Sequence, residues 1–187
     1  MKTLKIAALI FAVGSLTVHA NGAEVNTEKT KVVWTGKKIG SSHTGEIKLK
    51  SGQLEIEGDK ISGGEFVMDM NSISNSDIKN EEYKQKLVGH LKSDDFFGVE
   101  KYPTASFSIT NATAFKGSMA QVDGKLTIKG NTEPISFNVE KRGDVYVANI
   151  EIDRSKFDVR FGSKSFFNNL GDNVINDIFT LNVELHL

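Results

Sequence analysis

Cysteine is absent from the sequence, and proline occurs only twice in 187 residues. Without cysteine the chain can form no disulfide and offers no thiolate nucleophile, and we expect no lipid anchor of the bacterial lipoprotein type. Long apolar runs are also missing after residue 20, because no later segment approaches the ~20 apolar residues that a membrane-spanning helix requires. We therefore expect the fold to be stabilised by its core alone.

An excess of one charge is missing too, since 23 basic and 24 acidic side chains give a formal net charge of -1. Nucleic-acid binding needs a basic stripe, and the aromatic residues here are not interleaved with runs of Lys and Arg. No nucleic-acid partner is therefore expected. The 17 glycine residues are typical of a strongly bent sheet.

The first twenty residues differ in composition from the rest of the chain. Lys2 and Lys5 precede a largely apolar run from Ile6 to Val18, and Ala20 provides a small residue for cleavage. This order is typical of a secretory signal peptide. We expect residues 1–20 to be removed and residues 21–187 to form one exported domain.

Apolar and polar residues alternate along most of the remaining chain, as they do in strands with one dry and one wet face. The alternation predicts strands at 32–40, 43–50, 53–57, 61–70, 104–115, 119–129, 134–140, 144–153 and 179–187. Turn signals separate them at Ser51-Gly52, Gly58-Asp59 and 142–144, whereas Asp123-Gly124 is either a turn or a bulge inside a longer strand. We expect a mainly β fold, a single antiparallel barrel of about eight strands.

One substantial helix is predicted from about Asn80 to Lys92. Tyr83, Leu87 and Leu91 form an apolar stripe at a spacing of four residues, and Asn80 is suited to cap the first turn. Phe96 and Phe97 follow together, and a strand begins at Thr104. We expect the helix and the double Phe to lie near one end of the barrel.

Composition does not decide whether the barrel interior is filled or hollow. The dry faces carry Phe66, Met68, Phe107, Phe137, Phe179 and Leu181. These side chains are either ordinary core or the wall of a tunnel for an elongated apolar molecule. The lack of charged residues on the dry faces favours a lipid over a sugar or a nucleotide.

The block KLVGHLKSDDFFGVEKYPTASF at 86–107 resembles the YceI-like, polyisoprenoid-binding family. Four further segments match that family in order, namely SSHTG at 41–45, GKLTIKG at 124–130, IDRSKFDVRFG at 152–162 and FFNNLGD at 166–172. The chain departs from the family pattern at Gly98, where an acidic residue is frequent, and at Phe157, where Trp is common. The resemblance implies a lipocalin-like barrel whose apolar interior holds an isoprenoid chain, in a protein of the periplasm.

On this resemblance we expect a binding protein, not an enzyme, that holds a polyprenyl chain or an isoprenoid quinone for carriage or storage, with no cofactor and no metal. Transient membrane contact is expected, and the oligomeric state stays open between monomer and homodimer. The polar head of the lipid is expected to meet His43, His90, Arg154 or Arg160. The tunnel wall or lid is expected to comprise Trp34, Phe66, Met68, Leu87, Leu91, Phe96, Phe97, Phe107, Phe137, Phe157, Phe161, Phe166, Phe167, Phe179 and Leu181.

Alternatives stay open both for individual residues and for the function class. His43 and His90 form no close-spaced metal-ligand motif, and hydrogen bonding at a barrel end is favoured over a metal site. The charges between Asp153 and Arg160 suit pairing that pins this segment better than recognition of a head group. A filled barrel that engages envelope partners through its outer surface is the second function class. An enzyme acting on the lipid is the third and least supported, because the chain has no GxSxG elbow and no glycine-rich phosphate loop.

Overall fold

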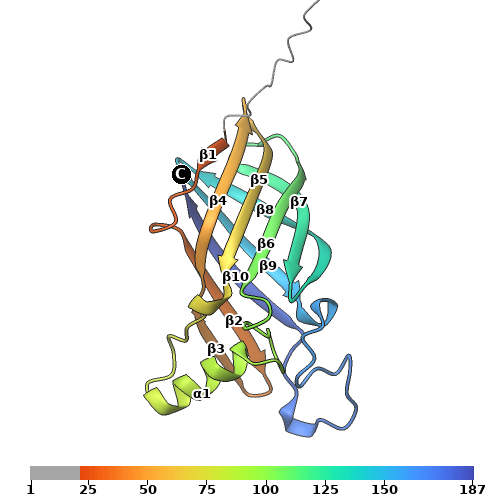
Figure 1. Cartoon of the computed structure of the whole chain (residues 1–187). Helices are drawn as coiled ribbons and strands as arrows, with labels where there is room; N and C mark the ends of the chain where they lie inside the picture. The colour runs from red at the N-terminus through yellow and green to blue at the C-terminus, as the bar shows by residue number, and fades with distance from the viewer. Residues whose placement is uncertain (1–21) are drawn as a thin grey trace, which may run out of the picture.

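The computed structural model describes residues 22–187, so the predicted signal peptide lies outside the described residues. One antiparallel sheet follows the strand order β1-β4-β5-β6-β7-β8-β9-β10-β2-β3 (Figure 1). The described part of the chain has one α-helix, α1 (Glu81–Lys92), and three short 3-10 helices, η1 (Met70–Ser72), η2 (Arg154–Phe157) and η3 (Gly171–Asn173). The strands are β1 (Gly22–Glu24), β2 (Lys31–Lys38), β3 (Ser41–Glu46), β4 (Lys48–Glu57), β5 (Lys60–Asp69), β6 (Thr104–Ala112), β7 (Met119–Ile128), β8 (Asn131–Arg142), β9 (Val145–Asp153) and β10 (Ile178–His186).

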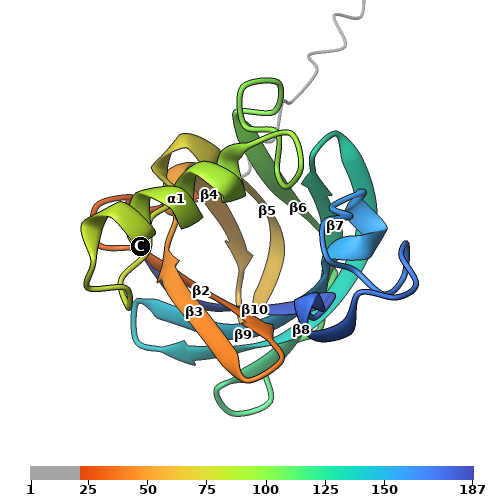
Figure 2. The ribbon, with the colours of Figure 1, turned by 90° about the horizontal axis from the view of Figure 1, so that it is seen from below.

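The sheet closes into a barrel because β3 and β4 are two halves of one bent strand, joined at Ile47. The first half pairs with β2 and the second half pairs with β5, and the Ile47 amide continues the first ladder by donating to the Val32 carbonyl at 3.0 Å. Counting β3 and β4 as one, eight strands form the ring that Figure 2 shows along its axis. The predicted lipocalin-like antiparallel barrel is confirmed.

The turn predictions are confirmed at two positions. Gly58 and Gly143 have φ values of 63° and 64°, and they begin the tight connections β4–β5 and β8–β9. This left-handed region favours glycine because it has no Cβ. The short strand β1, which pairs with β4, was not predicted, because three residues are too few to show a period of two.

Two glycine residues that look like turn signals in the sequence lie inside strands, where they allow close packing. Ser51-Gly52 is not a turn: Gly52 lies within β4, just after a register irregularity between Leu49 and Ser51, and an added Cβ there would lie 3.0 Å from the Phe66 ring. Gly124 lies inside β7 beneath the ring of Phe107, opposite an irregularity in β6. The longer-strand alternative for Asp123-Gly124 is therefore correct.

Helix α1 begins where predicted, because the Asn80 side chain accepts a hydrogen bond from the Tyr83 amide at 3.0 Å. Tyr83 itself is exposed, so the predicted apolar stripe narrows to Leu87 and Leu91. The helix crosses one end of the barrel (Figures 1 and 2). No helix within residues 22–187 has the length and apolar character needed to cross a membrane.

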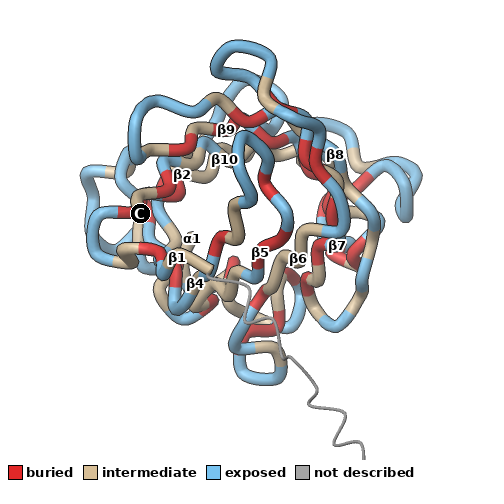
Figure 3. Tube along the Cα trace, turned by 90° about the horizontal axis from the view of Figure 1, so that it is seen from above, coloured by how far each residue is buried: buried red, intermediate tan, exposed pale blue. Residues whose placement is uncertain are grey.

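Burial follows the predicted alternation along the strands. In β7 and β9, buried residues alternate with more exposed ones over most of their length. Figure 3 shows this alternation around the ring, with exposed residues gathered at the turns. The dry faces of all eight ring strands therefore point toward the barrel axis.

Candidate functional site

The barrel interior is hollow and consists of two adjoining chambers. The outer chamber, next to α1, has a volume of about 300 Å³, and the inner chamber has about 140 Å³. Their walls share Val32, Met68, Leu126, Ile152 and Leu181. Together they form one elongated cavity along the barrel axis.

Aromatic and aliphatic side chains supply almost the whole wall of this cavity. Phe179, Leu181, Val183 and Leu185 face it from alternate positions of β10, a distance of ~20 Å along the strand. In the inner chamber, the Phe107 ring lies 6.3 Å from the ring of Phe66 and 5.4 Å from that of Phe137. Such a wall suits an elongated apolar molecule and offers few partners to a polar one.

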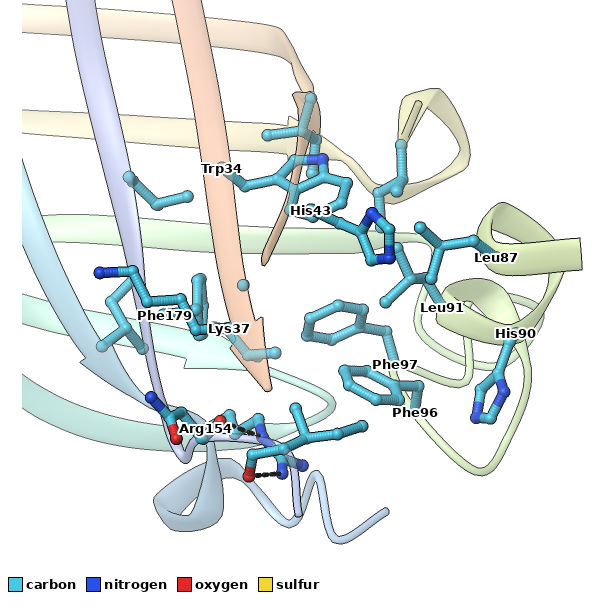
Figure 4. Close-up of a pocket in the computed structure, with 18 of the residues that line it drawn as sticks. Trp34, Lys37, His43, Leu87, His90, Leu91, Phe96, Phe97, Arg154 and Phe179 are labelled. Atoms are coloured by element: carbon cyan, nitrogen blue, oxygen red, sulfur yellow. Dashed lines mark hydrogen bonds between the residues drawn. The ribbon is translucent and has the colours of Figure 1, made fainter. Parts of the chain in front are cut away.

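The outer chamber is covered by the C-terminal half of α1 and the loop that follows it, here called the lid (87–98). Leu87, Leu91, Phe96 and Phe97 point from the lid toward Trp34 and Phe179 (Figure 4). The loop folds back on the helix, because the Phe97 amide donates to the Leu91 carbonyl at 3.2 Å. The double Phe and the helix end therefore form one structural unit over the opening.

His90 is the polar residue of the lid. Its ring packs edge-on against Phe161 at 4.4 Å and Phe96 at 5.8 Å between ring centres. Its Nε2 atom is buried without a hydrogen-bond partner, as is one oxygen of Asp177 in the described chain. Leaving such an atom unpaired costs about 1–3 kcal/mol, so His90 is a polar group at the cavity mouth that still lacks a partner.

A second polar group, His43, is fixed by the segment that leads into α1. Residues 73–77, here called the clasp, run along the free edge of β3, where the amides of Ser74 and Ser76 donate to carbonyls of β3. The Asp77 carboxylate accepts from His43 Nδ1 and from the Thr44 amide, both at 2.9 Å. Burial alone would raise the pKa of Asp77, but hydrogen bonds from Thr44, His43 and Asn75 outweigh it and lower the pKa.

Trp34 and Gly45 explain how closely the clasp approaches the barrel. The Trp34 indole donates to the Ser74 carbonyl at 3.1 Å, and a Cβ at Gly45 would collide with that same carbonyl. The segment SSHTG at 41–45 therefore supplies two hydrogen-bond donors to Asp77, from His43 and Thr44. It also supplies Gly45, whose lack of a side chain leaves room for the clasp.

The opposite side of the mouth, here called the plug (153–162), is organised around Arg154, whose side chain is only 2% exposed. Its guanidinium donates to the carbonyls of Val159 at 2.8 Å, Ile175 at 3.0 Å and Asn176 at 3.1 Å, and Asp177 lies 3.3 Å away. Burial lowers the pKa of Arg154, and the carboxylates of Asp177 and Asp153 oppose that shift. Arg154 faces the outer chamber but is engaged in holding the chain, as expected for a charge that pins this segment.

Four of the expected site residues lie away from the cavity. Phe157 is 1% exposed and lies within the plug, where it belongs to the packed core, so it is not part of the tunnel wall. Phe166 and Phe167 are exposed, and Arg160 pairs with Asp158 beside a separate outer hollow that Phe167 also lines. The sequence in this region shows no clear period, which is why the expectation failed there.

The other expected residues do line the cavity, and Phe161 lies between it and the outer hollow. Several wall residues were not anticipated. Those in strands occupy the alternate positions that the period of two predicts, whereas Ile175 lies in a loop without any such signal. The missed residues include Val32, Ile47, Ala105, Leu126, Ile128, Ile152 and Ile175.

The chain is similar in sequence to a known protein family and to several of its relatives. The family model described as YceI-like domain matches residues 24–187. A UPF0312 protein of Vibrio cholerae is 27% identical over 75% of this chain and 74% of its own length. A UPF0312 protein of Photorhabdus laumondii is 42% identical, over 29% of this chain and 28% of its own length.

Solved structures share the fold. Burkholderia cenocepacia BcnA has a TM-score of 0.69 at 24% identity, and the match covers 86% of this chain and 98% of that chain. A polyisoprenoid binding domain from Saccharophagus degradans has a TM-score of 0.60 at 16% identity, over 87% of this chain and 95% of that chain. A Campylobacter jejuni YCEI protein has a TM-score of 0.55 at 18% identity, over 100% of this chain and 98% of that chain.

Proposed function

The chain belongs to the YceI-like domain family, and on this premise we propose that it binds a long isoprenoid lipid inside its barrel. The proposed ligand is a polyprenyl chain or an isoprenoid quinone, held for carriage or storage in the periplasm after export. The similarity in fold to a polyisoprenoid binding domain supports this choice of ligand.

The observation that carries the proposal is the elongated apolar cavity. Its two adjoining chambers disfavour the alternative of a barrel filled by its own side chains. The basic side chains of the wall are Lys37, Lys38, His43, His90 and Arg154, and all of them belong to the outer chamber. The inner chamber therefore suits the hydrocarbon chain, and the outer chamber suits the polar head. We propose binding without chemistry on the lipid.

The energetics explain why the cavity must be both dry and long. One isoprene unit of five carbons gains up to ~4 kcal/mol on leaving water, at ~0.8 kcal/mol per carbon. It gains almost nothing relative to a bilayer, and ordering a long chain costs entropy. Retention outside a membrane therefore requires several units buried together, which an elongated cavity provides and a shallow pocket would not.

Extraction of the purified protein tests the proposal directly. Protein exported by its bacterial host is extracted with organic solvent, and the extract is quantified by mass spectrometry. We expect close to one isoprenoid per chain, and a folded protein that yields none would contradict the proposal.

A matched pair of variants shows whether the lipid occupies the cavity. Ala148 lines the inner chamber, whereas Ala114 is exposed near the β6–β7 turn. Ala148→Phe should reduce the recovered lipid several-fold, because the new ring fills the chamber. Ala114→Phe should leave it unchanged. Equal recovery from the two folded variants would place the lipid elsewhere on the protein.

A further inference from the structure

Large apolar side chains are exposed mainly at one end of the barrel. Met119, the first residue of β7, lies at the end away from α1, because the Phe115 amide in the β6–β7 connection donates to the Asp59 carbonyl of the β4–β5 turn. The other exposed large apolar residues of the described chain lie in α1, in the β2–β3 turn, in the segment 159–170 and at the start of β10, all of which Figure 1 shows at the α1 end of the barrel. They are Ile39, Tyr83, Phe161, Phe166, Phe167 and Ile178.

Two loops carry four of these side chains and are joined into one surface. The β2–β3 turn presents Ile39, and its neighbour Lys37 accepts a backbone hydrogen bond from Asn176 at 2.8 Å. The segment 159–170 presents the three Phe side chains, and its Gly162 carbonyl accepts from the Ile175 amide at 2.9 Å. The segment 174–176 is therefore hydrogen-bonded to both loops. For this reason we treat residues 37–39 and 159–170 together and call them the mouth surface.

The charged residues within the mouth surface itself are basic. The end of β2 contributes Lys37 and Lys38, the segment 159–170 contributes Arg160 and Lys164, and neither stretch contains an acidic residue. Acidic residues border the surface at the outer hollow, where Asp158 pairs with Arg160, so within residues 22–187 Lys37, Lys38 and Lys164 are its unpaired basic groups. The Arg160 guanidinium lies 5.0 Å from the centre of the Phe166 ring, so basic and aromatic groups are interleaved. Apolar side chains beside basic ones are typical of surfaces that lie in the interface of an anionic bilayer.

We propose that the mouth surface docks on an anionic lipid bilayer. Phe166, Phe167 and Ile39 enter the boundary between head groups and acyl chains. Lys37, Lys38 and Lys164 meet the anionic head groups, whereas Arg160 is paired with Asp158. Phe161 lines the cavity as well as the outer hollow, so the docked cavity opens onto the membrane. A lipid then passes between bilayer and barrel without crossing water. This transfer role depends on the proposed function, whereas bilayer docking itself does not.

Vesicle flotation tests the docking. The mature protein is mixed with isoprenoid-free vesicles of phosphatidylethanolamine and phosphatidylglycerol, and the bound fraction is compared with that on pure phosphatidylcholine. We expect stronger binding to the anionic vesicles and a decline with salt. Phe166→Ser with Phe167→Ser, and separately Lys164→Glu, should each weaken binding by about fivefold or more. Met119→Ser and Lys116→Glu, at the opposite end, are the matched controls and should bind as the wild type does.

Two results would overturn the docking proposal. One is equal flotation of mouth and control variants. The other is a homodimer in sedimentation that Phe166→Ser with Phe167→Ser converts to monomer, with no vesicle binding by the wild type, since the surface would then cover a second copy of the chain. Isoprenoid content separates the two proposals, because the mouth variants should retain lipid supplied in detergent. Vesicle binding by a lipid-free protein would leave docking intact and contradict the proposed cargo.

Discussion

The plug and the lid close the same cavity mouth by different physical means. The plug is fixed by Arg154, a buried guanidinium that donates to three backbone carbonyls. The lid lies over the cavity through apolar side chains. Lysine side chains join it to neighbouring segments, because Lys92 Nζ donates to the Asn71 carbonyl of η1 at 2.7 Å and Lys129 Nζ donates to the Asp94 carbonyl at 3.1 Å. The plug and the lid meet where the Arg154 guanidinium lies 5.4 Å from the centre of the Phe96 ring.

This difference indicates which side can open. Breaking the hydrogen bonds of the buried Arg154 leaves a charge without compensation, which is strongly unfavourable. Displacing the lid instead exposes apolar side chains, and that cost is recovered when the same side chains meet a lipid or a bilayer. We therefore expect the plug to keep its conformation while the lid moves to admit the ligand.

Arg154→Met should give the largest effect, because three carbonyls lose their donor and Asp177 loses its buried partner. We expect a loss of about 3–5 kcal/mol in the free energy of unfolding, measured by urea denaturation. Arg160→Met is the matched control, since that guanidinium is exposed and pairs only at the surface. Its effect should stay below about 0.5 kcal/mol, and a similar loss in both variants would refute the special role of Arg154.

Gly45→Ala tests the fit between the clasp and the barrel. The new methyl group would collide with the Ser74 carbonyl and the Trp34 ring, so we expect a loss of about 1–3 kcal/mol. Gly36→Ala is the control on the neighbouring strand, where an added Cβ has nothing within 4 Å. Thermal denaturation should show a lower melting temperature for the first variant only, and unchanged melting of Gly45→Ala would contradict the close approach.

Phe97→Ser tests the lid and should cost less stability than the two preceding variants can, because Phe97 is only half-buried. We expect a loss of about 1–2 kcal/mol from the lost apolar contact, together with faster uptake and release of an isoprenoid. Stopped-flow fluorescence of Trp34, the single tryptophan of the chain, measures both rates. A double change of Phe96 and Phe97 to Ser extends the test, and a folded double variant with native lipid content and uptake rate would exclude a gating role.

Protonation of Asp77 at acid pH should weaken the contact between the clasp and β3. We expect the smallest effect on the free energy of unfolding from this change. The pKa of Asp77 is held below its ordinary value of 3.8, so its ionised form stabilises the fold above that pH. This contribution disappears as the pH falls through the lowered pKa. Asp77→Asn should therefore lose less than about 1 kcal/mol at neutral pH, because the side chain is one-third exposed.

The same variant should show a flatter decline of the free energy of unfolding below pH 4. Asp59→Asn, at an exposed turn at the opposite end, should keep the wild-type acid profile. Matching acid profiles for Asp77→Asn and the wild type would show that the clasp carboxylate does not couple folding to pH.

Much of the fold was predictable from the sequence because its signals are local. The alternation in β10 fixes which residues face the barrel axis, and Asn80 marks the start of α1 through its own side-chain hydrogen bond. Glycine was harder to interpret, since Gly52 looks like a turn in the sequence but serves a close approach to Phe66. A turn and a tight contact require the same residue for different reasons.

The site was predictable where the strands build it and less so where loops do. Arg154 appears in the sequence as one of several alternating charges, and two of its carbonyl partners, Ile175 and Asn176, lie more than twenty residues away. The environments of Phe157 and Phe166 differ for the same reason, since Phe157 is buried as part of the plug and Phe166 is exposed on the mouth surface. Tertiary contacts decide these roles, and the local pattern does not contain them.

Quenching of Trp34 by a brominated polyprenyl chain tests the central claim most directly, because the Trp34 side chain lines the outer chamber. The delipidated wild-type protein is titrated in parallel with Ala148→Phe. We predict that quenching of the wild type saturates near one equivalent and that the variant needs several-fold more ligand. A folded wild-type protein whose Trp34 emission does not respond to the brominated chain would contradict an isoprenoid-binding cavity.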